Sequence, residues 1–104
     1  MRIGSGSSGL GGSIVESDGL VARLADGTLA GSVVTMNESV VRLARLAGIG
    51  LEDSLIAHST TPARLLSEHD RGELAVGVRG DLVAIDDDGT VLLTVVAGDI
   101  VHQA

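Results

Sequence analysis

The sequence predicts an α/β chain in which short strands come first, helices follow and a three-stranded meander ends the chain. Apolar residues recur at spacings of three and four between residues 33 and 65, which is typical of helices with one buried face. On either side, short runs rich in Val, Leu and Ile alternate with Gly and Asp, as in strands joined by turns. The 104 residues include no Phe, Trp or Tyr, so we expect one domain at most, with a modest aliphatic core.

A tract of glycine and serine, residues 1–13, is predicted to form a flexible linker or an ordered glycine loop. Three of its glycines match the spacing of a dinucleotide-binding fingerprint, but no helix is indicated after them and almost no chain precedes them. Two short strands are expected next, at residues 14–15 and 20–24, around an Asp-Gly turn.

A helix is expected between Val33 and Ala47, where apolar side chains form a single stripe. Thr35 and Glu38 have the spacing of a capping box, and Gly48 is a typical stop signal. These signals together predict a helix that buries one face.

Two shorter helices and three strands are expected in the rest of the chain. Residues 52–59 begin with acidic side chains, which favour the positive end of a helix dipole. Thr61 is a good N-cap and Pro62 a good first helical residue, so a third helix is predicted there. The strands are predicted from runs of Val, Leu and Ile at residues 81–86, 91–97 and 100–102. A three-stranded meander needs a second sheet to cover one of its faces.

The composition argues against several classes of protein. Seven Arg, no Lys and 14 acidic residues give a net charge of −7, so the chain would repel the phosphates of a nucleic acid. No apolar run approaches the roughly 20 residues that cross a bilayer, and no signal-peptide pattern is present. The lack of cysteine excludes thiol catalysis and fits a reducing cytoplasm. We therefore expect a cytoplasmic protein with no nucleic acid and no membrane as partner.

The three histidines, His58, His69 and His102, do not have the spacing of metal ligands. His58 is expected to be packed and hydrogen-bonded, and the other two to be partly exposed polar residues. The serines do not occur in a nucleophile-elbow pattern. The histidines and serines therefore do not indicate a catalytic centre.

Two groups of charged residues have a structural and a functional interpretation. The acidic run 86–88 resembles the start of a calcium loop, but it lacks the terminal bidentate Glu, which favours a solvated turn. Arg42, Arg45 and Arg64 could bind a phosphate, or they could simply form a solvent-facing helix edge.

The stretch DGTLAGS, residues 26–32, holds two glycines and two hydroxyls ahead of the first helical pattern. It is predicted either to be a loop that closes onto a helix or to offer main-chain groups to a polar small molecule. In the second interpretation Leu29, Ala30 and Gly31 bind the ligand. Physical arguments alone leave both open.

The sequence resembles a known family over nearly everything from Leu10 to Val101. GTLAGS followed by a Thr-Met helix is similar to the C-terminal part of N-acetylglucosamine-6-phosphate deacetylases, which are members of the amidohydrolase superfamily. The PAR motif at residues 62–64 and the glycine spacing of GEL, G and GDLV between residues 72 and 83 recur more widely among amidohydrolases. Gly80 departs from the Ala that is usual at its position.

This resemblance implies a C-terminal fragment of an amidohydrolase, with the last helices of a TIM barrel and part of a composite β-sandwich. Residues 1–13 would be a linker or loop, 14–71 the end of the barrel and 72–104 the three-stranded part of the sandwich. The resemblance also implies that Leu29, Ala30 and Gly31 contact the sugar.

The catalytic groups of the family are expected upstream of this segment. A divalent, zinc-like metal polarises the amide and activates water, and a barrel Asp acts as base and then acid. The resemblance places no metal ligand, catalytic residue or cofactor in this chain. Asp18 and Asp26 are not favoured as that base, because the family's Asp closes a barrel strand ahead of the glycine segment.

Two hypotheses of function follow from the resemblance. In the first, the chain is part of a deacetylase, as a truncated polypeptide or one chain of a split enzyme. Its partners are then an amino sugar phosphate and the missing barrel portion or a homo-oligomer. In the second, it is a non-catalytic oligomeric or partner-binding module derived from the same fold. A different amidohydrolase specificity is a third, weaker option.

Overall fold

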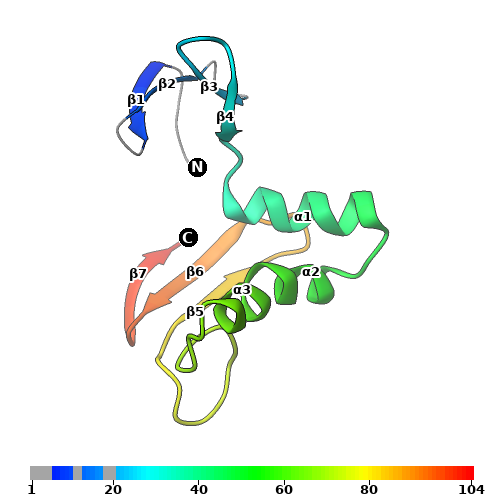
Figure 1. The fold of residues 1–104 in the computed structure, drawn as a ribbon. Helices are drawn as coiled ribbons and strands as arrows, with labels where there is room; N and C mark the ends of the chain where they lie inside the picture. Colours follow the sequence, from blue (N-terminus) through cyan, green and yellow to red (C-terminus); the bar gives the residue numbers. More distant parts are fainter. Residues whose placement is uncertain (1–5, 11–12, 18–20) are drawn as a thin grey trace. The chain divides into compact units, whose positions relative to one another are not determined.

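A computed structural model describes residues 6–10, 13–17 and 21–104 of the chain (Figure 1). Within these residues, four strands come first, then three helices and finally three strands. The chain divides into two compact units, unit 1 (Met1–Thr35) and unit 2 (Met36–Ala104). The predicted boundaries at residues 13 and 71 stay a prediction.

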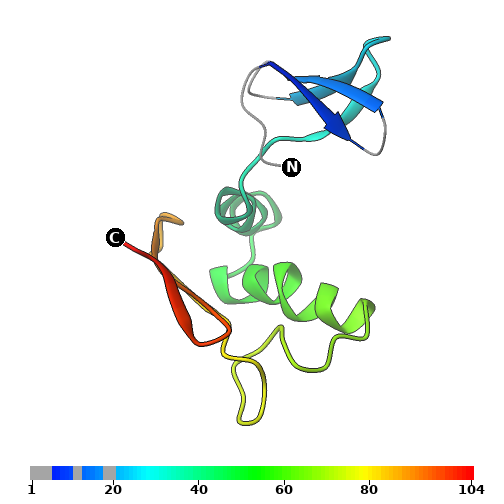
Figure 2. The ribbon, with the colours of Figure 1, turned by 90° about the vertical axis from the view of Figure 1, so that its left-hand side faces the viewer.

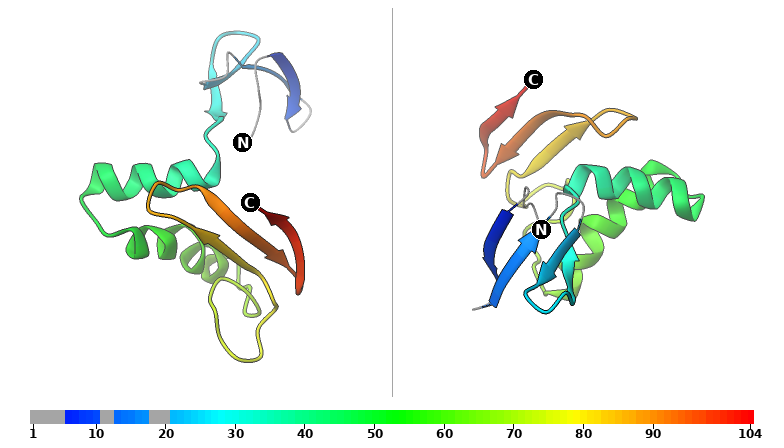
Figure 3. Two further views of the ribbon diagram at one scale, coloured as in Figure 1. Left: turned by 180° about the vertical axis from the view of Figure 1, so that it is seen from behind. Right: turned by 90° about the horizontal axis from the view of Figure 1, so that it is seen from above.

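Unit 1 contains a four-stranded antiparallel sheet in which neighbours in sequence are also neighbours in space, as the right panel of Figure 3 shows from above. Its strands are β1 (Gly6–Leu10), β2 (Ser13–Ser17), β3 (Val21–Leu24) and β4 (Leu29–Ser32). Val15 of β2 and Ala22 of β3 are fully buried. These small side chains place the buried part of the unit at its two central strands.

The hairpin predicted after the glycine tract is confirmed, because β2 and β3 pair antiparallel with Val15 opposite Leu24. Its turn, residues 18–20, lies outside the described residues. The tract 1–13, for which the composition predicts a linker or loop, contains strand β1, which pairs with β2 along its whole length. Ladder hydrogen bonds come from the main chain, so glycine and serine can form a strand once a partner strand is present.

Unit 2 begins with α1 (Met36–Ala47), α2 (Leu51–His58) and α3 (Thr60–Leu65). All three predicted helices are present, but α1 begins at Met36 rather than at Val33. The preceding residues are β-branched, and the Val34 N–H donates a hydrogen bond to the Ser32 Oγ at 3.1 Å, so the main chain stays non-helical there. Helix α3 already includes Thr60, so the prediction of Thr61 as its N-cap is wrong.

The buried side chains of unit 2 lie where α1 meets α2. Val40 of α1 is 3% exposed and Ser54 of α2 is fully buried. The Ser54 hydroxyl donates a hydrogen bond to the main-chain oxygen of Val40 at 2.6 Å, which satisfies the only polar group of that side chain. Figure 2 shows α1 almost end-on while α2 runs across the view, so the two helix axes are far from parallel.

The predicted meander is confirmed as an antiparallel sheet of β5 (Leu82–Ile85), β6 (Val91–Val96) and β7 (Asp99–Gln103). Figure 3, left, shows its three strands side by side. The β5–β6 turn docks on α1 through a hydrogen bond of 2.8 Å from Asn37 Nδ2 to the Gly89 oxygen. Gly89 has a φ of +84°, and a Cβ atom there would lie 2.6 Å from Val41 Cγ2.

The close approach at Gly89 predicts that Gly89→Ala destabilises unit 2. The left-handed main chain and the clash with Val41 should together lower the free energy of unfolding by about 2–4 kcal/mol. Gly77→Ala is a matched control, because Gly77 has a φ of +89° but no atom within 4 Å of the added Cβ. Urea unfolding, monitored by circular dichroism, measures the free energy of unfolding of both variants. Equal losses in the two variants would contradict the role of the contact with α1.

Candidate functional site

The stretch Asp26–Ser32 begins with a tight hairpin turn. The Leu24 N–H donates to the Thr28 oxygen at 2.7 Å, and the Gly27 N–H donates to the Leu24 oxygen at 2.9 Å. Gly27 has a φ of +86°, which glycine adopts at low cost. A three-residue loop with a left-handed glycine in its last position is a common hairpin connection.

Two charged side chains of the hairpin hold this turn. Asp26 Oδ1 accepts a hydrogen bond from the Thr28 N–H at 2.9 Å. Arg23 Nη1 donates a hydrogen bond to the Gly27 oxygen at 3.1 Å. Both side chains are exposed, and both contacts are with residues of the same hairpin. The geometry of the turn is therefore encoded locally.

A β-bulge lies in the middle of the predicted substrate segment. Arg23 is paired with Leu29, but the next residue back along β3, Ala22, is paired with Gly31. Ala30 is therefore an extra residue on β4 without a Cα partner on β3. A bulge disrupts the ladder locally and changes the direction of the strand, and bulges are common beside active sites.

Strand β4 also lies at an edge of the described sheet, because β3 is its single neighbour. Main-chain groups that point away from β3 have no strand partner within that sheet. Leu29 is 60% exposed, and Ala30 and Gly31 are partly buried. The segment thus combines an exposed apolar side chain with two residues small enough for a ligand to approach the main chain.

The sequence interpretation of residues 26–32 as a loop is corrected by this geometry. Asp26 to Thr28 belong to the turn, whereas Leu29–Ser32 form strand β4, and the helix does not begin until Met36. The hairpin was missed because β4 contains a bulge and two small residues, which obscure the alternation expected of a strand. The Asp-Gly pair at residues 26–27 is the signal that could have revealed it.

The Asp26 carboxylate stabilises the turn by accepting hydrogen bonds from Thr28. Hydrogen bonds from the Thr28 hydroxyl and then from the Thr28 N–H lower the pKa of Asp26 from its ordinary value of 3.8. A carboxylate with a lowered pKa is a weaker base, which agrees with the expectation that Asp26 is not the general base. Asp18, the other carboxylate considered, lies outside the described residues.

His58 is packed and hydrogen-bonded, as predicted. Its Nδ1 lies 2.8 Å from the Ser54 oxygen and its Nε2 lies 2.9 Å from Ser39 Oγ. A carbonyl oxygen only accepts, so Nδ1 must carry a proton, and in the neutral ring Nε2 accepts from the Ser39 hydroxyl. The imidazole therefore links α1 to α2, and both of its nitrogens are occupied.

The other polar candidates are exposed or hold turns. His69 and His102 are exposed, as are the three arginines of the helical region, Arg42, Arg45 and Arg64. The acidic run begins a turn, because Asp86 Oδ1 accepts hydrogen bonds from the main-chain N–H groups of Asp88 and Thr90 at 3.0 and 2.9 Å. The solvated-turn interpretation of this run is confirmed.

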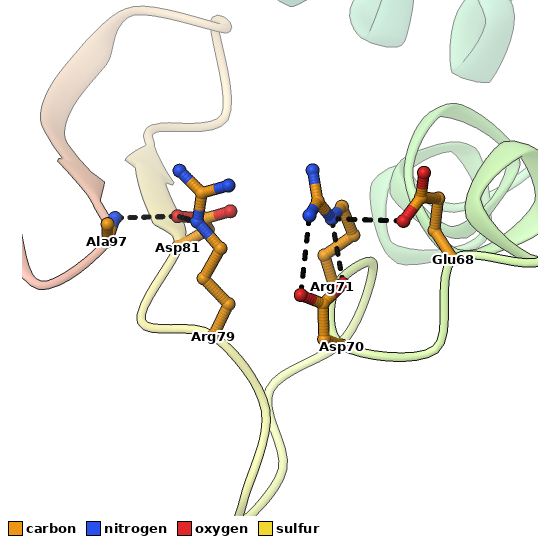
Figure 4. A network of polar contacts seen from close by, with 6 residues as sticks. All are labelled: Glu68, Asp70, Arg71, Arg79, Asp81 and Ala97. Carbon is orange, nitrogen blue, oxygen red and sulfur yellow. Dashed lines mark hydrogen bonds and ion pairs between the residues drawn. The ribbon is translucent and has the colours of Figure 1, made fainter.

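Figure 4 shows a network of charges between α3 and β5 that the sequence interpretation missed. Arg71 Nε lies 2.9 Å from Asp70 Oδ1 and 3.7 Å from Glu68 Oε2. Asp81 Oδ1 lies 3.0 Å from Arg79 Nε and accepts a hydrogen bond of 2.7 Å from the Ala97 N–H. The Arg79 Nε–H is not directed at the carboxylate, so its contact is an ion pair without a hydrogen bond.

Asp81 supports a strained turn. Ala97 has a φ of +51°, which is unfavourable for a residue with a Cβ, and the Asp81 carboxylate accepts its N–H. A hollow of about 400 Å³ adjoins this turn and is lined mainly by apolar atoms. Its charged lining residues, Arg79 and Asp81, form an ion pair with each other. Apart from this ion pair, whose Arg79 Nε–H makes no hydrogen bond, none of the residues that line the hollow has a charged side chain that could orient a ligand.

The described part of the chain contains neither a cluster of metal ligands nor a membrane-spanning helix. In residues 6–10, 13–17 and 21–104, no three His, Cys, Asp or Glu side chains gather as a metal site would require. No helix among these residues has the length and apolar character to span a bilayer.

Known proteins of similar sequence share one activity in their names. The chain is 38% identical over 106 residues to the N-acetylglucosamine-6-phosphate deacetylase of Homo sapiens, and 37% identical over 91 residues to that of Bacillus subtilis. These alignments cover 100% and 86% of the chain, but 26% and 23% of the relatives. An N-acetylgalactosamine-6-phosphate deacetylase of Shewanella is 34% identical over 87 residues, which are 84% of the chain and 22% of that enzyme. No protein-family model matches the chain.

Solved structures of similar fold agree with these relatives. The N-acetylglucosamine-6-phosphate deacetylase of Thermotoga maritima has a TM-score of 0.79 at 33% identity, over 95% of this chain and 27% of that one. The enzyme of Mycobacterium smegmatis, solved in complex with N-acetyl-D-glucosamine-6-phosphate, has a TM-score of 0.76 at 32% identity, over 94% of this chain and 27% of that one.

Fold and relatives together define the class first: the chain is a mixed helix and sheet segment that is similar to part of the deacetylases of the amidohydrolase kind. Its particular relatives are the N-acetylglucosamine-6-phosphate deacetylases, and the chain is homologous to their C-terminal quarter. The resemblance stated from the sequence is thereby confirmed. The chain spans about a quarter of the length of the curated relatives it matches.

The hydrogen bonds to Asp26 predict how its hairpin responds to acid. The pKa of Asp26 is lowered in the folded chain, so its stabilising contribution is present above pH 3.8 and is lost as the pH falls through the lowered pKa. Carbon-13 NMR titration of the Asp26 carboxyl should give a pKa below 3.8. Thr28→Val should move it upward by removing one donor. A wild-type pKa at or above 3.8 would contradict the expectation.

Proposed function

We propose that the chain forms the C-terminal segment of an enzyme that hydrolyses the acetamide of an amino sugar 6-phosphate, a reaction of amino sugar catabolism. The observation that carries the proposal is the match of the chain to deacetylases whose names specify such sugars. The relatives include enzymes named for N-acetylglucosamine and for N-acetylgalactosamine. The shared substrate class is therefore a 2-acetamido sugar bearing a 6-phosphate.

Within this function, Leu29, Ala30 and Gly31 contact the substrate. The bulge at Ala30 interrupts the ladder of an edge strand, and Ala30 and Gly31 have little or no side chain to hold a sugar away from the main chain. The exposed Leu29 side chain offers apolar surface beside these main-chain groups. Such a site can bind and orient a sugar, but it supplies no acid, base or nucleophile.

The reacting groups belong to the rest of the full enzyme in this proposal. When bound there, a divalent, zinc-like metal would polarise the amide and activate water. The described residues of this chain do not assemble the ligands for such a metal, so no step through it is assigned to them. The catalytic Asp is likewise assigned to the barrel portion outside this segment, and the setting is expected to be the cytoplasm.

The partner of the chain is then the missing barrel portion, in the same polypeptide or as a separate chain. Several apolar side chains of unit 2 support a large partner surface, because they are more than 60% exposed: Leu46, Leu65, Leu66, Leu74, Val76 and Ile100. The second candidate, a non-catalytic oligomeric or partner-binding module, would use the same apolar side chains between copies of the chain.

Replacing the C-terminal quarter of the Bacillus subtilis relative with this chain tests the proposed function. The chimera is expected to deacetylate N-acetylglucosamine-6-phosphate or N-acetylgalactosamine-6-phosphate, whereas the chain alone should be inactive. Leu29→Ala in the chimera should raise KM about tenfold, corresponding to about 1.4 kcal/mol, because contact with the sugar is lost. Steady-state assays of acetate release measure the activity of the chimera and the KM of the Leu29→Ala variant.

Leu92→Ala is the matched control, since it truncates an exposed leucine of unit 2 that is not among the side chains of the partner surface, and it should leave KM unchanged. A folded chimera that is inactive on both sugars would contradict the proposed function. The module hypothesis would instead be supported if the chain alone forms a symmetric oligomer and Leu29→Ala changes neither its assembly nor the KM of the chimera.

A further inference from the structure

The position of the bulge depends on the turn that precedes it. The three-residue loop pairs Leu24 with Thr28 through the bond of 2.7 Å, and the next ladder pair is Arg23 with Leu29. The extra residue then falls at Ala30. A loop that was one residue longer or shorter would shift the ladder and turn each following side chain to the other face.

Arg23 contacts both parts of this arrangement. Its main chain is the ladder partner of Leu29, the first residue of the substrate segment. Its Nη1 atom donates to the Gly27 oxygen at 3.1 Å, on the far side of the loop. Arg23 thus links Gly27, the last residue of the loop, to strand β3, which sets the register of β4.

We propose that Arg23 is a positioning residue that fixes the register of the β3–β4 hairpin and so places the bulge at Ala30. A charged donor forms a stronger hydrogen bond with a carbonyl than a neutral one does, and the Gly27 oxygen that accepts this bond lies in the β3–β4 loop itself. The consequence for substrate binding rests on the proposed function, whereas the effect on register does not.

Amide hydrogen exchange in the 104-residue chain tests the register directly. Arg23→Met keeps the length of the side chain but removes the donor, so exchange at the Leu24 N–H should become about threefold to tenfold faster. Cross-strand proton contacts between Ala22 and Gly31, measured by NMR, should weaken. Arg23→Lys retains a charged donor, so its Leu24 exchange rate and its Ala22–Gly31 contacts should be close to those of the wild type.

Arg42→Met is the control, because Arg42 is an exposed arginine of α1 in the other unit. It should leave the Leu24 exchange rate and the Ala22–Gly31 contacts as in the wild type. The proposal is overturned if Arg23→Met also leaves both unchanged, or if Arg23→Lys is as damaging as Arg23→Met.

The chimeric enzyme tests the consequence for binding. Arg23→Met should raise KM about threefold to tenfold and change kcat by less than about twofold, with Arg23→Lys between it and the wild type. A general loss of folded enzyme would instead lower the apparent kcat at constant KM, and that result would overturn the positioning role. If the wild-type chimera is inactive, the proposed function fails, and the exchange experiment alone decides the role of Arg23.

Discussion

The lack of any aromatic side chain is the constraint on which the rest of this structure depends. Phe, Trp and Tyr usually supply the largest buried areas, so this chain must fold around Val, Leu, Ile and Ala. The fully buried side chains are correspondingly small: Val15 and Ala22 in the described part of unit 1, and Ser54 in unit 2. With so little buried apolar area, the geometry of each element depends strongly on main-chain ladders and on a few short polar contacts.

These polar contacts occur where elements meet. Ser54 and His58 join the first two helices, Asn37 joins α1 to the β5–β6 turn, and Asp81 holds the turn at Ala97. The contacts of Asn37 and Asp81 satisfy main-chain groups of turns, at Gly89 and Ala97, whereas Ser54 and His58 bond to groups of α1. Hydrogen bonds are directional, so they define the approach of two elements more sharply than contacts between small aliphatic side chains can.

The sequence predicted secondary structure best where the spacing of apolar residues was regular over a whole helix or strand. Helix α2 and the meander β5 to β7 were predicted within a few residues, because acidic residues begin the helix and turn residues separate the apolar strands. Strand β1 could not be predicted, since glycine and serine have no strand preference and the strand exists through its pairing with β2. The bulge at Ala30 was missed for a related reason: register is a property of two strands, and the residues of one strand do not determine it.

The hairpin explains how this segment carries the proposed substrate contacts without any of the reacting groups. Every contact shown to shape the turn, from Arg23, Asp26 and the main chain of Leu24, comes from within the hairpin itself. A metal centre, in contrast, needs side chains that several distant elements bring to one point. In the proposed function, this quarter-length segment therefore holds the binding strand, while the chemistry that acts on the bound sugar requires the larger part of the enzyme.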